Sequence, residues 1–303
     1  MNTSSWPLIL FFGELAIKVL MIAIVILQRK KTSSAKLAWI LLIIFIPFVG
    51  TLLYLLLGTR RLGAIRRKRH QKIISQIPQC VAAHSCCHKI ENAKINPKFH
   101  SISSVAETVG ASFVLDGNDA TLFGDSDKLI ASLANDIENS KHHCHVLSYI
   151  MLEDDAGKHI STALINATKR GVTCRLLLDA MGSKDFLKSE TCSQLRKSGI
   201  HVVAALPASV LRAVLVRLDL RNHRKIAVID NSIGYMGSNN IAEPSFAPKP
   251  KFAPWVDASI RLTGPIVREL QAIFVQDWFM DSDENLAEIL KEPLVIPVDG
   301  FPA

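Results

Sequence analysis

The sequence Arg221-Asn222-His223-Arg224-Lys225-Ile226-Ala227-Val228-Ile229-Asp230 places two basic side chains at the start of an apolar, β-branched run. Such a run is typical of a β-strand. Successive side chains of a strand point to opposite faces, so residues two apart share a face. The spacing therefore predicts that His223 and Lys225 point the same way, toward one site at the beginning of the strand.

A second strand is expected to return beside the first. Asp230-Asn231-Ser232 is typical of a turn, and residues 233–236 are again mostly apolar. The return leads to Gly237-Ser238-Asn239-Asn240, which is expected to bring Ser238 and Asn240 beside the basic pair. An imidazole, a cation, a hydroxyl and an amide around one point suit a phosphate oxyanion.

Together these segments match the pattern HxK(x)4D(x)6GSxN at every position and resemble the signature of the phospholipase D superfamily. The resemblance is more specifically to bacterial cardiolipin synthases because of two later segments, Trp255-Val256-Asp257 and Gly264-Pro265-Ile266-Val267. The similarity runs from the N-terminal apolar segments to about Asp281. Those enzymes resemble two fused halves with one motif each. This sequence holds one such motif, so it resembles an N-terminal half that ends before the second.

The site residues have distinct expected roles. A neutral His223 would attack the phosphorus of a phosphodiester, giving a phosphohistidine that a hydroxyl acceptor then displaces. Lys225, Asn240 and Ser238 would donate to the phosphate oxygens as charge develops in the transition state. No metal or other cofactor is expected, because the diester bond itself carries the energy into the exchange.

Three further polar residues complete the expected site. Asp230 lies an odd number of residues from both basic partners, so it is expected to hold the turn, with a direct catalytic role as the alternative. The resemblance implies that Asp257 is the carboxylate that fixes the tautomer of the histidine and supports its positive charge. Arg221 is expected either to bind substrate phosphate or to lie on a solvated rim.

The resemblance also implies a missing group, because a second histidine must protonate the leaving alkoxide or activate the incoming hydroxyl. The chain is expected to pair with a second copy of itself or with a separate second half. The leading hypothesis is a phosphatidyltransferase that converts two phosphatidylglycerol molecules to cardiolipin and glycerol. The alternatives are a membrane-tethered homodimeric phosphodiesterase, nuclease or phospholipase D, and an inactive half.

The first part of the chain predicts membrane attachment. Residues 7–27 and 37–57 are each long and apolar enough to span a bilayer, so residues 1–59 are expected to form a transmembrane hairpin. The net charge of +8 suggests an anionic partner, and its concentration beside these segments favours phospholipid over nucleic acid. The larger basic cluster after the second segment places the catalytic domain in the cytosol, against the inner membrane of a bacterium.

The remaining chain predicts an α/β half-domain. Residues 60–105 are expected to be a basic juxtamembrane segment and linker, residues 106–285 the half-domain, and residues 286–303 a tail. Ser126 is expected to cap a helix that runs through Ile137, and further helices are expected over His159–Lys169, over Asp185–Lys197 and from Pro265. Besides the two strands at the site, strands are expected at residues 145–150, 172–178, 200–204 and 258–262. This alternation of helices and strands predicts a mostly parallel sheet between helices, the arrangement that the resemblance also implies. Six cysteines show no disulfide framework, so reduced thiols are expected. Cys80, Cys86 and Cys87, with His84 and His88, match no regular zinc spacing and predict an irregular surface cluster.

Overall fold

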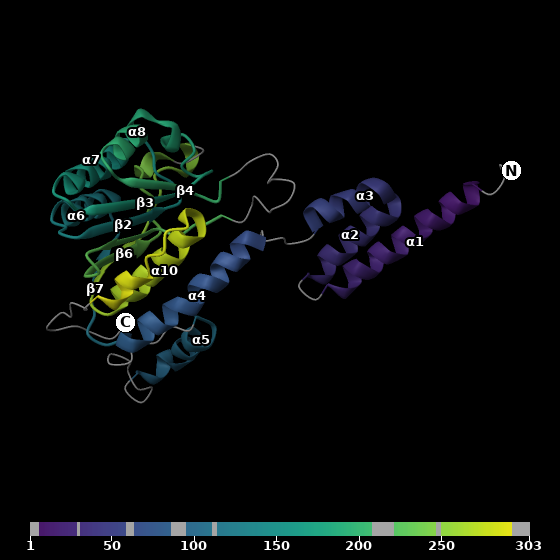
Figure 1. Ribbon diagram of the computed structural model, residues 1–303, viewed down its shortest axis with the longest axis horizontal. Helices are drawn as coiled ribbons and strands as arrows, with labels where there is room; N and C mark the ends of the chain where they lie inside the picture. Colours follow the sequence, from purple (N-terminus) through teal and green to yellow (C-terminus); the bar gives the residue numbers. More distant parts are fainter. Residues whose placement is uncertain are drawn as a thin grey trace. The chain divides into compact units, whose positions relative to one another are not determined.

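The structure is a computed structural model that describes residues 6–28, 31–58, 64–85, 95–110, 114–207, 221–246 and 250–292 (Figure 1). The described residues fall into a small unit that ends at Ala64 and a larger unit that begins at Ile65. The small unit holds the apolar segments, and the larger one holds the predicted site.

Four helical segments form the small unit: α1 (Trp6–Leu27), α2 (Ser33–Phe45), α3 (Pro47–Leu53) and the π-helical turn η1 (Tyr54–Gly58). Helix α1 is the one described helix with the length and hydropathy of a membrane span. The second expected span is not one continuous helix. The chain breaks at Ile46 (φ −133°, ψ 72°), and Pro47 then begins α3. A proline inside a helix removes a backbone hydrogen bond, which explains the break.

The larger unit is built on a sheet of seven strands in the order β1-β7-β6-β5-β2-β3-β4. The strands are β1 (Asp119–Phe123), β2 (His143–Ser148), β3 (Thr173–Asp179), β4 (His201–Ala205), β5 (Ile226–Ile229), β6 (Ile233–Gly237) and β7 (Ser259–Thr263). The pairs β2–β3 and β3–β4 are parallel, and the other four are antiparallel. The expected mostly parallel sheet is therefore wrong, and the sheet is mixed. The described residues between β5, β6 and β7 contain no crossover helix, and these strands pair antiparallel.

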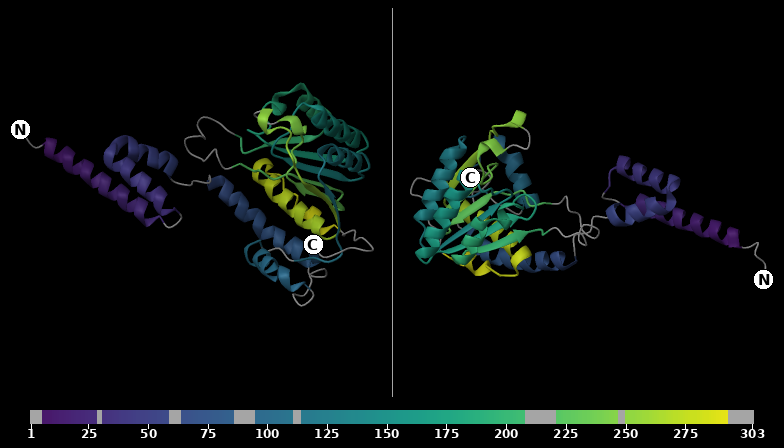
Figure 2. Two further views of the ribbon diagram at one scale, coloured as in Figure 1. Left: turned by 180° about the vertical axis from the view of Figure 1, so that it is seen from behind. Right: turned by 90° about the horizontal axis from the view of Figure 1, so that it is seen from above.

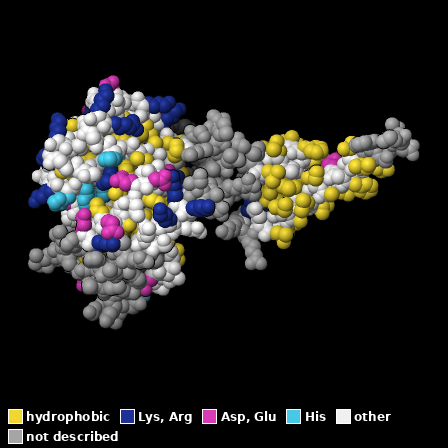
Figure 3. All heavy atoms as spheres, viewed as in Figure 1, with side chains coloured by type: hydrophobic (Ala, Val, Ile, Leu, Met, Phe, Trp, Pro, Cys, Tyr) yellow, Lys and Arg dark blue, Asp and Glu magenta, His cyan; other side chains and the backbone are white. Residues whose placement is uncertain are grey.

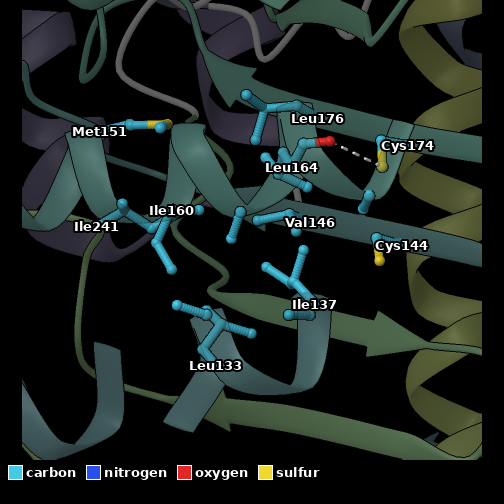
Figure 4. Packing of buried hydrophobic residues seen from close by; sticks show 14 of the residues in the cluster. Leu133, Ile137, Cys144, Val146, Met151, Ile160, Leu164, Cys174, Leu176 and Ile241 are labelled. Carbon is cyan, nitrogen blue, oxygen red and sulfur yellow. Dashed lines mark hydrogen bonds between the residues drawn. The ribbon is translucent and has the colours of Figure 1, made fainter. Parts of the chain in front are cut away.

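Helices cover both faces of the sheet (Figure 2). One face carries α6 (Ser126–Glu138), α7 (Asp155–Lys169) and α8 (Glu190–Lys197), and the other carries α10 (Ile266–Ser282). Figure 4 shows the first of these cores, where the buried Leu133 and Leu164 of two helices meet Val146 and Leu176 of two strands. Burial of these apolar side chains is the main force that holds the layers together.

Helix caps account for most differences between expected and observed helix boundaries. Asp125, and not Ser126, caps α6 by accepting hydrogen bonds from two backbone N–H groups. Helix α7 begins four residues before the expected His159, because Asp154 caps it by accepting from Gly157 N. The expected helix over residues 185–197 consists of a 3-10 turn, η4 (Phe186–Lys188), and then α8 capped by Ser189. An acidic or hydroxyl side chain thus begins each of these helices.

The expected linker contains ordered helices: α4 (Ala64–Ser85), η3 (Pro97–Phe99) and α5 (His100–Gly110). Helix α4 packs on α10, where Ile73 is fully buried against Val275 and Phe279. Its basic side chains also serve this contact, because Arg66 Nη1 lies 2.8 Å from Asp281 Oδ1 and Arg69 pairs with Asp283. Part of the basic cluster that was expected to face lipid is thus neutralised within the domain.

Short 3-10 turns complete the described chain. They are η5 (Pro244–Phe246), η6 (Pro250–Phe252) and η7 (Ala287–Lys291). Turn η7 lies in the expected tail, yet its Leu290 is fully buried beside α10. Cys144, Cys174 and Cys192 are buried free cysteines. Most of the expected irregular Cys/His cluster lies outside the described residues.

Candidate active site

The candidate site lies at the side of the sheet where the parallel strands β2, β3 and β4 have their carboxyl ends. We call this side, and not an outermost strand, the sheet edge. Tyr149 follows β2 and Asp179 ends β3, while β5 begins and β6 ends at the same edge. Residues 221–225 run along this edge into β5. Groups at the carboxyl ends of parallel strands converge in this way in α/β sheets, which makes the edge a common place for a binding site.

The segment before β5 directs its side chains to two sides. Asn222 Nδ2 and Arg224 Nη1 both donate to Asp277 of α10, at 2.8 Å and at 2.7 to 2.9 Å. His223 and Lys225 contact each other instead, with Lys225 Nζ 2.8 Å from His223 Nδ1. The alternation of side chains expected of a strand thus already holds in residues 222–225, just before β5 begins. It places the imidazole of His223 beside the ammonium of Lys225.

The surroundings shift the pKa of both basic groups. Desolvation and the charge of Lys225 lower the pKa of His223, against the opposing charge of Asp179. Burial lowers the pKa of Lys225 to about 8, against the opposing charge of Asp257. The Tyr149 ring lies beside both, 4.2 Å from the imidazole centroid and 5.4 Å from Lys225 Nζ. The site therefore favours a neutral imidazole beside a lysine that titrates near neutral pH.

Ser238 and Asn240 reach the same edge and bond to the backbone. Ser238 Oγ accepts from Ala258 N at 3.0 Å and lies 3.2 Å from Ala258 O. Asn240 Oδ1 accepts from Ile150 N at 3.1 Å. Lys225 and Asn240 line one cavity of about 40 Å³ between α6 and the sheet, and His223 and Ser238 are not part of its lining. The structure thus places Lys225 in contact with His223 and in the lining of the same cavity as Asn240.

Asp230 lies at the opposite end of β5 from the basic pair. Its carboxylate accepts hydrogen bonds from three consecutive backbone N–H groups, those of Lys141, His142 and His143, at 2.7 to 2.8 Å. These bonds tie the turn after β5 to the start of β2. The geometry matches the turn-holding role expected of this residue and separates it from the edge that carries His223.

Arg221 is occupied within the protein. Its Nε and Nη2 atoms bind the carboxylate of Asp179 at 2.7 to 3.1 Å, and Nη1 donates to Leu206 O at 2.9 Å. The Asp179 side chain is 1% exposed and also accepts from two backbone N–H groups of the turn that follows it. The structure therefore places Arg221 in a buried ion pair, where few of its N–H groups remain for a phosphate or for solvent.

Asp257 lies on the lysine side of the pair. Its charge acts on Lys225, and within the described part of the chain His223 Nδ1 contacts Lys225 Nζ and not this carboxylate. The carboxylate that acts electrostatically on His223 is Asp179. The expected role of Asp257 as the direct partner of the histidine is not seen in this arrangement.

Sequence reasoning missed Tyr149 and Asp179, although a signal for both existed. Each stands at or just after the end of an apolar strand that pairs in parallel with its neighbour. Residues in that position are expected to gather at one edge. Among the described residues, no three His, Cys, Asp or Glu side chains form a group able to hold a metal ion.

Comparison with known proteins identifies the class. Residues 133–278 match the family described as cardiolipin synthase, phospholipase D-like domain, and residues 17–58 match the family described as phospholipase D-nuclease N-terminal. Residues 133–278 of the chain thus belong to the family of the cardiolipin synthase, phospholipase D-like domain.

Individual relatives agree with that assignment. Cardiolipin synthase A of Wigglesworthia glossinidia brevipalpis is 35% identical over 93% of this chain and 56% of that protein. Cardiolipin synthase A of Erwinia tasmaniensis is 31% identical over 90% of this chain and 57% of that protein. The chain thus spans little more than half the length of these relatives. The crystal structure of Nuc, a phospholipase D family member from Salmonella typhimurium, is 16% identical, with a TM-score of 0.40 over 55% of this chain and 99% of that one.

Proposed function

We propose that this chain is the first half of a membrane-anchored phosphatidyltransferase that moves a phosphatidyl group between phosphatidylglycerol molecules and forms cardiolipin and glycerol. The observation that carries the proposal is the 2.8 Å contact between His223 Nδ1 and Lys225 Nζ at the strand edge. It lies inside the region that matches the cardiolipin synthase domain. The apolar helix α1 supports attachment to a membrane.

In the first step, His223 Nε2 attacks the phosphorus of one phosphatidylglycerol. The P–N bond forms as the P–O bond to the headgroup glycerol breaks, and that oxygen leaves with its electron pair and takes up a proton. In the second step, a hydroxyl of another phosphatidylglycerol gives up its proton and attacks the phosphohistidine, which breaks the P–N bond. Lys225 and the Asn240 amide would stabilise the negative charge on the phosphoryl oxygens in both steps.

The observed contact has a consequence for the tautomer of His223. While the Lys225 ammonium donates to Nδ1, the ring proton must sit on Nε2, which then has no free electron pair. A phosphate oxygen offers the ammonium a stronger, charged acceptor. Substrate binding is therefore expected to draw Lys225 away from the ring, so that Nδ1 takes the proton and Nε2 becomes the nucleophile.

The leaving and entering oxygens need a proton donor and acceptor on the far side of the phosphorus. We infer that a second histidine supplies this role, either from a second copy of this chain or from a separate second half. The first arrangement would be a homodimer with two His223 rings at one site.

The test uses anionic vesicles containing phosphatidylglycerol labelled in its phosphate. Full-length protein incubated with these vesicles is expected to yield labelled cardiolipin, and acid-labile label trapped on the protein at His223. Water as the acceptor would give phosphatidic acid instead and would identify a hydrolase. Cleavage of DNA without lipid turnover would favour the nuclease alternative. No trapped label in a monomeric protein would favour an inactive half.

A further inference from the structure

The second apolar segment folds back on itself. The carbonyl oxygen of Leu42 in α2 lies only 2.5 Å from the place where a Cβ on Gly50 of α3 would stand. Only a glycine permits that approach of two backbones. Nearer the ends of the two helices, the rings of Trp39 and Tyr54 pack edge to face at 5.4 Å, and Lys31 Nζ lies 4.5 Å from the Tyr54 ring centroid. The end of α3 thus returns to the level at which α2 begins.

Neither arm of this fold is long enough to cross a bilayer. Helix α2 has 13 residues, and α3 and η1 have 7 and 5. At 1.5 Å per residue, each arm reaches about 20 Å, whereas the apolar interior of a bilayer is about 30 Å thick. Helix α1 has 21 residues that qualify as a span and reaches the full thickness.

The turn between the arms lies against the middle of α1. A cavity of about 210 Å³ is lined by Glu14 and Ile17 of α1 together with Pro47, Phe48 and Thr51 of α3. The other end of the fold is fixed at the end of α1, where Lys36 Nζ donates to Ile26 O at 2.9 Å. The two arms, α2 and α3 with η1, therefore lie beside α1 from its last turn to about Glu14.

The surface of this unit is suited to lipid (Figure 3). At the turn, Phe45 is 78% exposed and Phe48 71% exposed. On the part of α1 beyond the turn, the side chains of residues 8–12 are 59% to 69% exposed. Two residues of the turn place no unpaired N–H group in the apolar layer, because Pro47 has no N–H and Ile46 donates to Leu42 O, and Ile46 O also accepts from Gly50 N. Such a turn is tolerable within the apolar layer.

We propose that α1 crosses the membrane once and that α2 and α3 form a re-entrant hairpin, which enters the bilayer and leaves it on the same side. Residues before α1 would then lie on one face of the membrane, and everything after residue 58 on the other. The proposal takes membrane anchoring from the proposed function and does not depend on phosphatidyl transfer.

The distribution of basic residues agrees with this topology. Residues 1–6 carry no basic side chain, while four basic residues lie between the end of α1 and the first turn of α2, and six follow the hairpin closely. These are Arg29, Lys30, Lys31 and Lys36, and then Arg60, Arg61, Arg66, Arg67, Lys68 and Arg69. With two full spans the two groups would lie on opposite faces. With one span and a re-entrant hairpin they share a face, as expected for the cytosolic side.

Cysteine labelling distinguishes the two topologies in the full-length chain. Two variants, Ser4→Cys and Ser33→Cys, are expressed in bacterial cells, and spheroplasts are treated with a membrane-impermeant maleimide before or after lysis. We expect Ser4→Cys to be labelled before lysis as fully as after it, and Ser33→Cys to gain label only after lysis. The exposed Ser33 stands at the start of α2, so the change leaves the Thr32 cap intact. The unchanged protein is the control for its own six cysteines, which should not be labelled before lysis, and any label that it gains after lysis is subtracted from that of each variant.

The reverse pattern, with Ser33→Cys labelled in intact spheroplasts while Ser4→Cys and the chain's own cysteines are protected, would overturn the proposal and establish two full spans. A second measurement avoids any effect of the cysteines: peptide tags at both ends are tested for removal by external protease. Loss of the first tag alone supports the proposal, and equal fates of both tags contradict it. Protein in the soluble fraction would refute membrane anchoring itself, whereas lost lipid turnover with this labelling pattern would refute only the transferase.

Discussion

The two ends of strand β5 carry two different kinds of polar residue. At its beginning, His223 and Lys225 contact each other and a tyrosine ring, and His223 is exposed at the sheet edge. At its end, the Asp230 carboxylate accepts hydrogen bonds from three consecutive backbone N–H groups where the neighbouring strand β2 begins. One sequence pattern thus contains a pair of basic side chains that contact each other at the sheet edge and a carboxylate that binds backbone groups at the other end of the strand. The two kinds of residue are distinguished by the groups that their side chains contact, and not by their place in the sequence pattern.

The largest expected effect is at the reactive end. His223→Ala should lower turnover of phosphatidylglycerol at least on the order of 10³-fold, because the nucleophile is lost. Its melting temperature should stay within a degree or two of the parent, since the side chain is exposed. Turnover by thin-layer separation of lipids and unfolding by circular dichroism measure the two quantities. Full turnover in this variant would remove the histidine from the mechanism.

Lys225→Ala should lower turnover by about 10² to 10³-fold, the usual cost of losing one donor that stabilises transition-state charge. Lys225→Arg is the matched control because it keeps the charge but changes the geometry of donation. We expect it to retain more activity than alanine. Equal activity in the alanine variant and the parent would show that the ammonium does not contact the reacting phosphate.

Arg221→Ala tests the buried ion pair with Asp179, which lies at the same end of β5 as His223. It should lower the free energy of unfolding by about 3 kcal/mol, because the 1% exposed Asp179 carboxylate would lose its cation. Denaturant titration measures the change, and Arg221→Lys should recover part of it. A melting temperature equal to that of the parent, combined with a raised KM, would instead assign Arg221 to substrate phosphate.

Asp230→Ala should lower the free energy of unfolding by about 2 kcal/mol, because three N–H groups lose a charged acceptor. The residue also has φ 50°, which alanine adopts less readily than aspartate or asparagine. Asp230→Asn should therefore lose less stability. Turnover per folded molecule should be nearly unchanged in both variants, and a large loss there would make the architectural end catalytic.

The smallest expected effect is on the pH profile of turnover. Because Lys225 has a pKa of about 8, it loses its charge as the pH rises through that value, and turnover should fall there by the loss of one cation. The pKa of His223 is lowered, so the imidazole stays neutral to below its ordinary range, and the acid limb should lie below about pH 6.5. Lys225→Arg should remove the alkaline limb, and a limb that persists in that variant would belong to another group.

Much of the fold could be predicted because its signals are local. Apolar periodicity located α6, α7, α10 and the strands other than β1 to within a few residues, and helix caps explain most of the remaining shifts. The mixed pairing could not be predicted in the same way. The direction in which two strands pair depends on whether a crossover helix connects them. The apolar pattern of β5 is the same for parallel and for antiparallel pairing. The break at Ile46 was missed because hydropathy measures apolar length and not helix continuity.

The sequence by itself determined the family and the pairing of His223 with Lys225, because alternation along an extended chain needs no knowledge of the rest of the fold. Only the tertiary structure decided that Asp179 holds Arg221, that Asp230 binds the start of β2, and that the second apolar segment turns back. Each of these contacts joins groups that are distant in sequence or depends on a backbone turn. Residue spacing carries no information about such contacts until the strands and helices are placed.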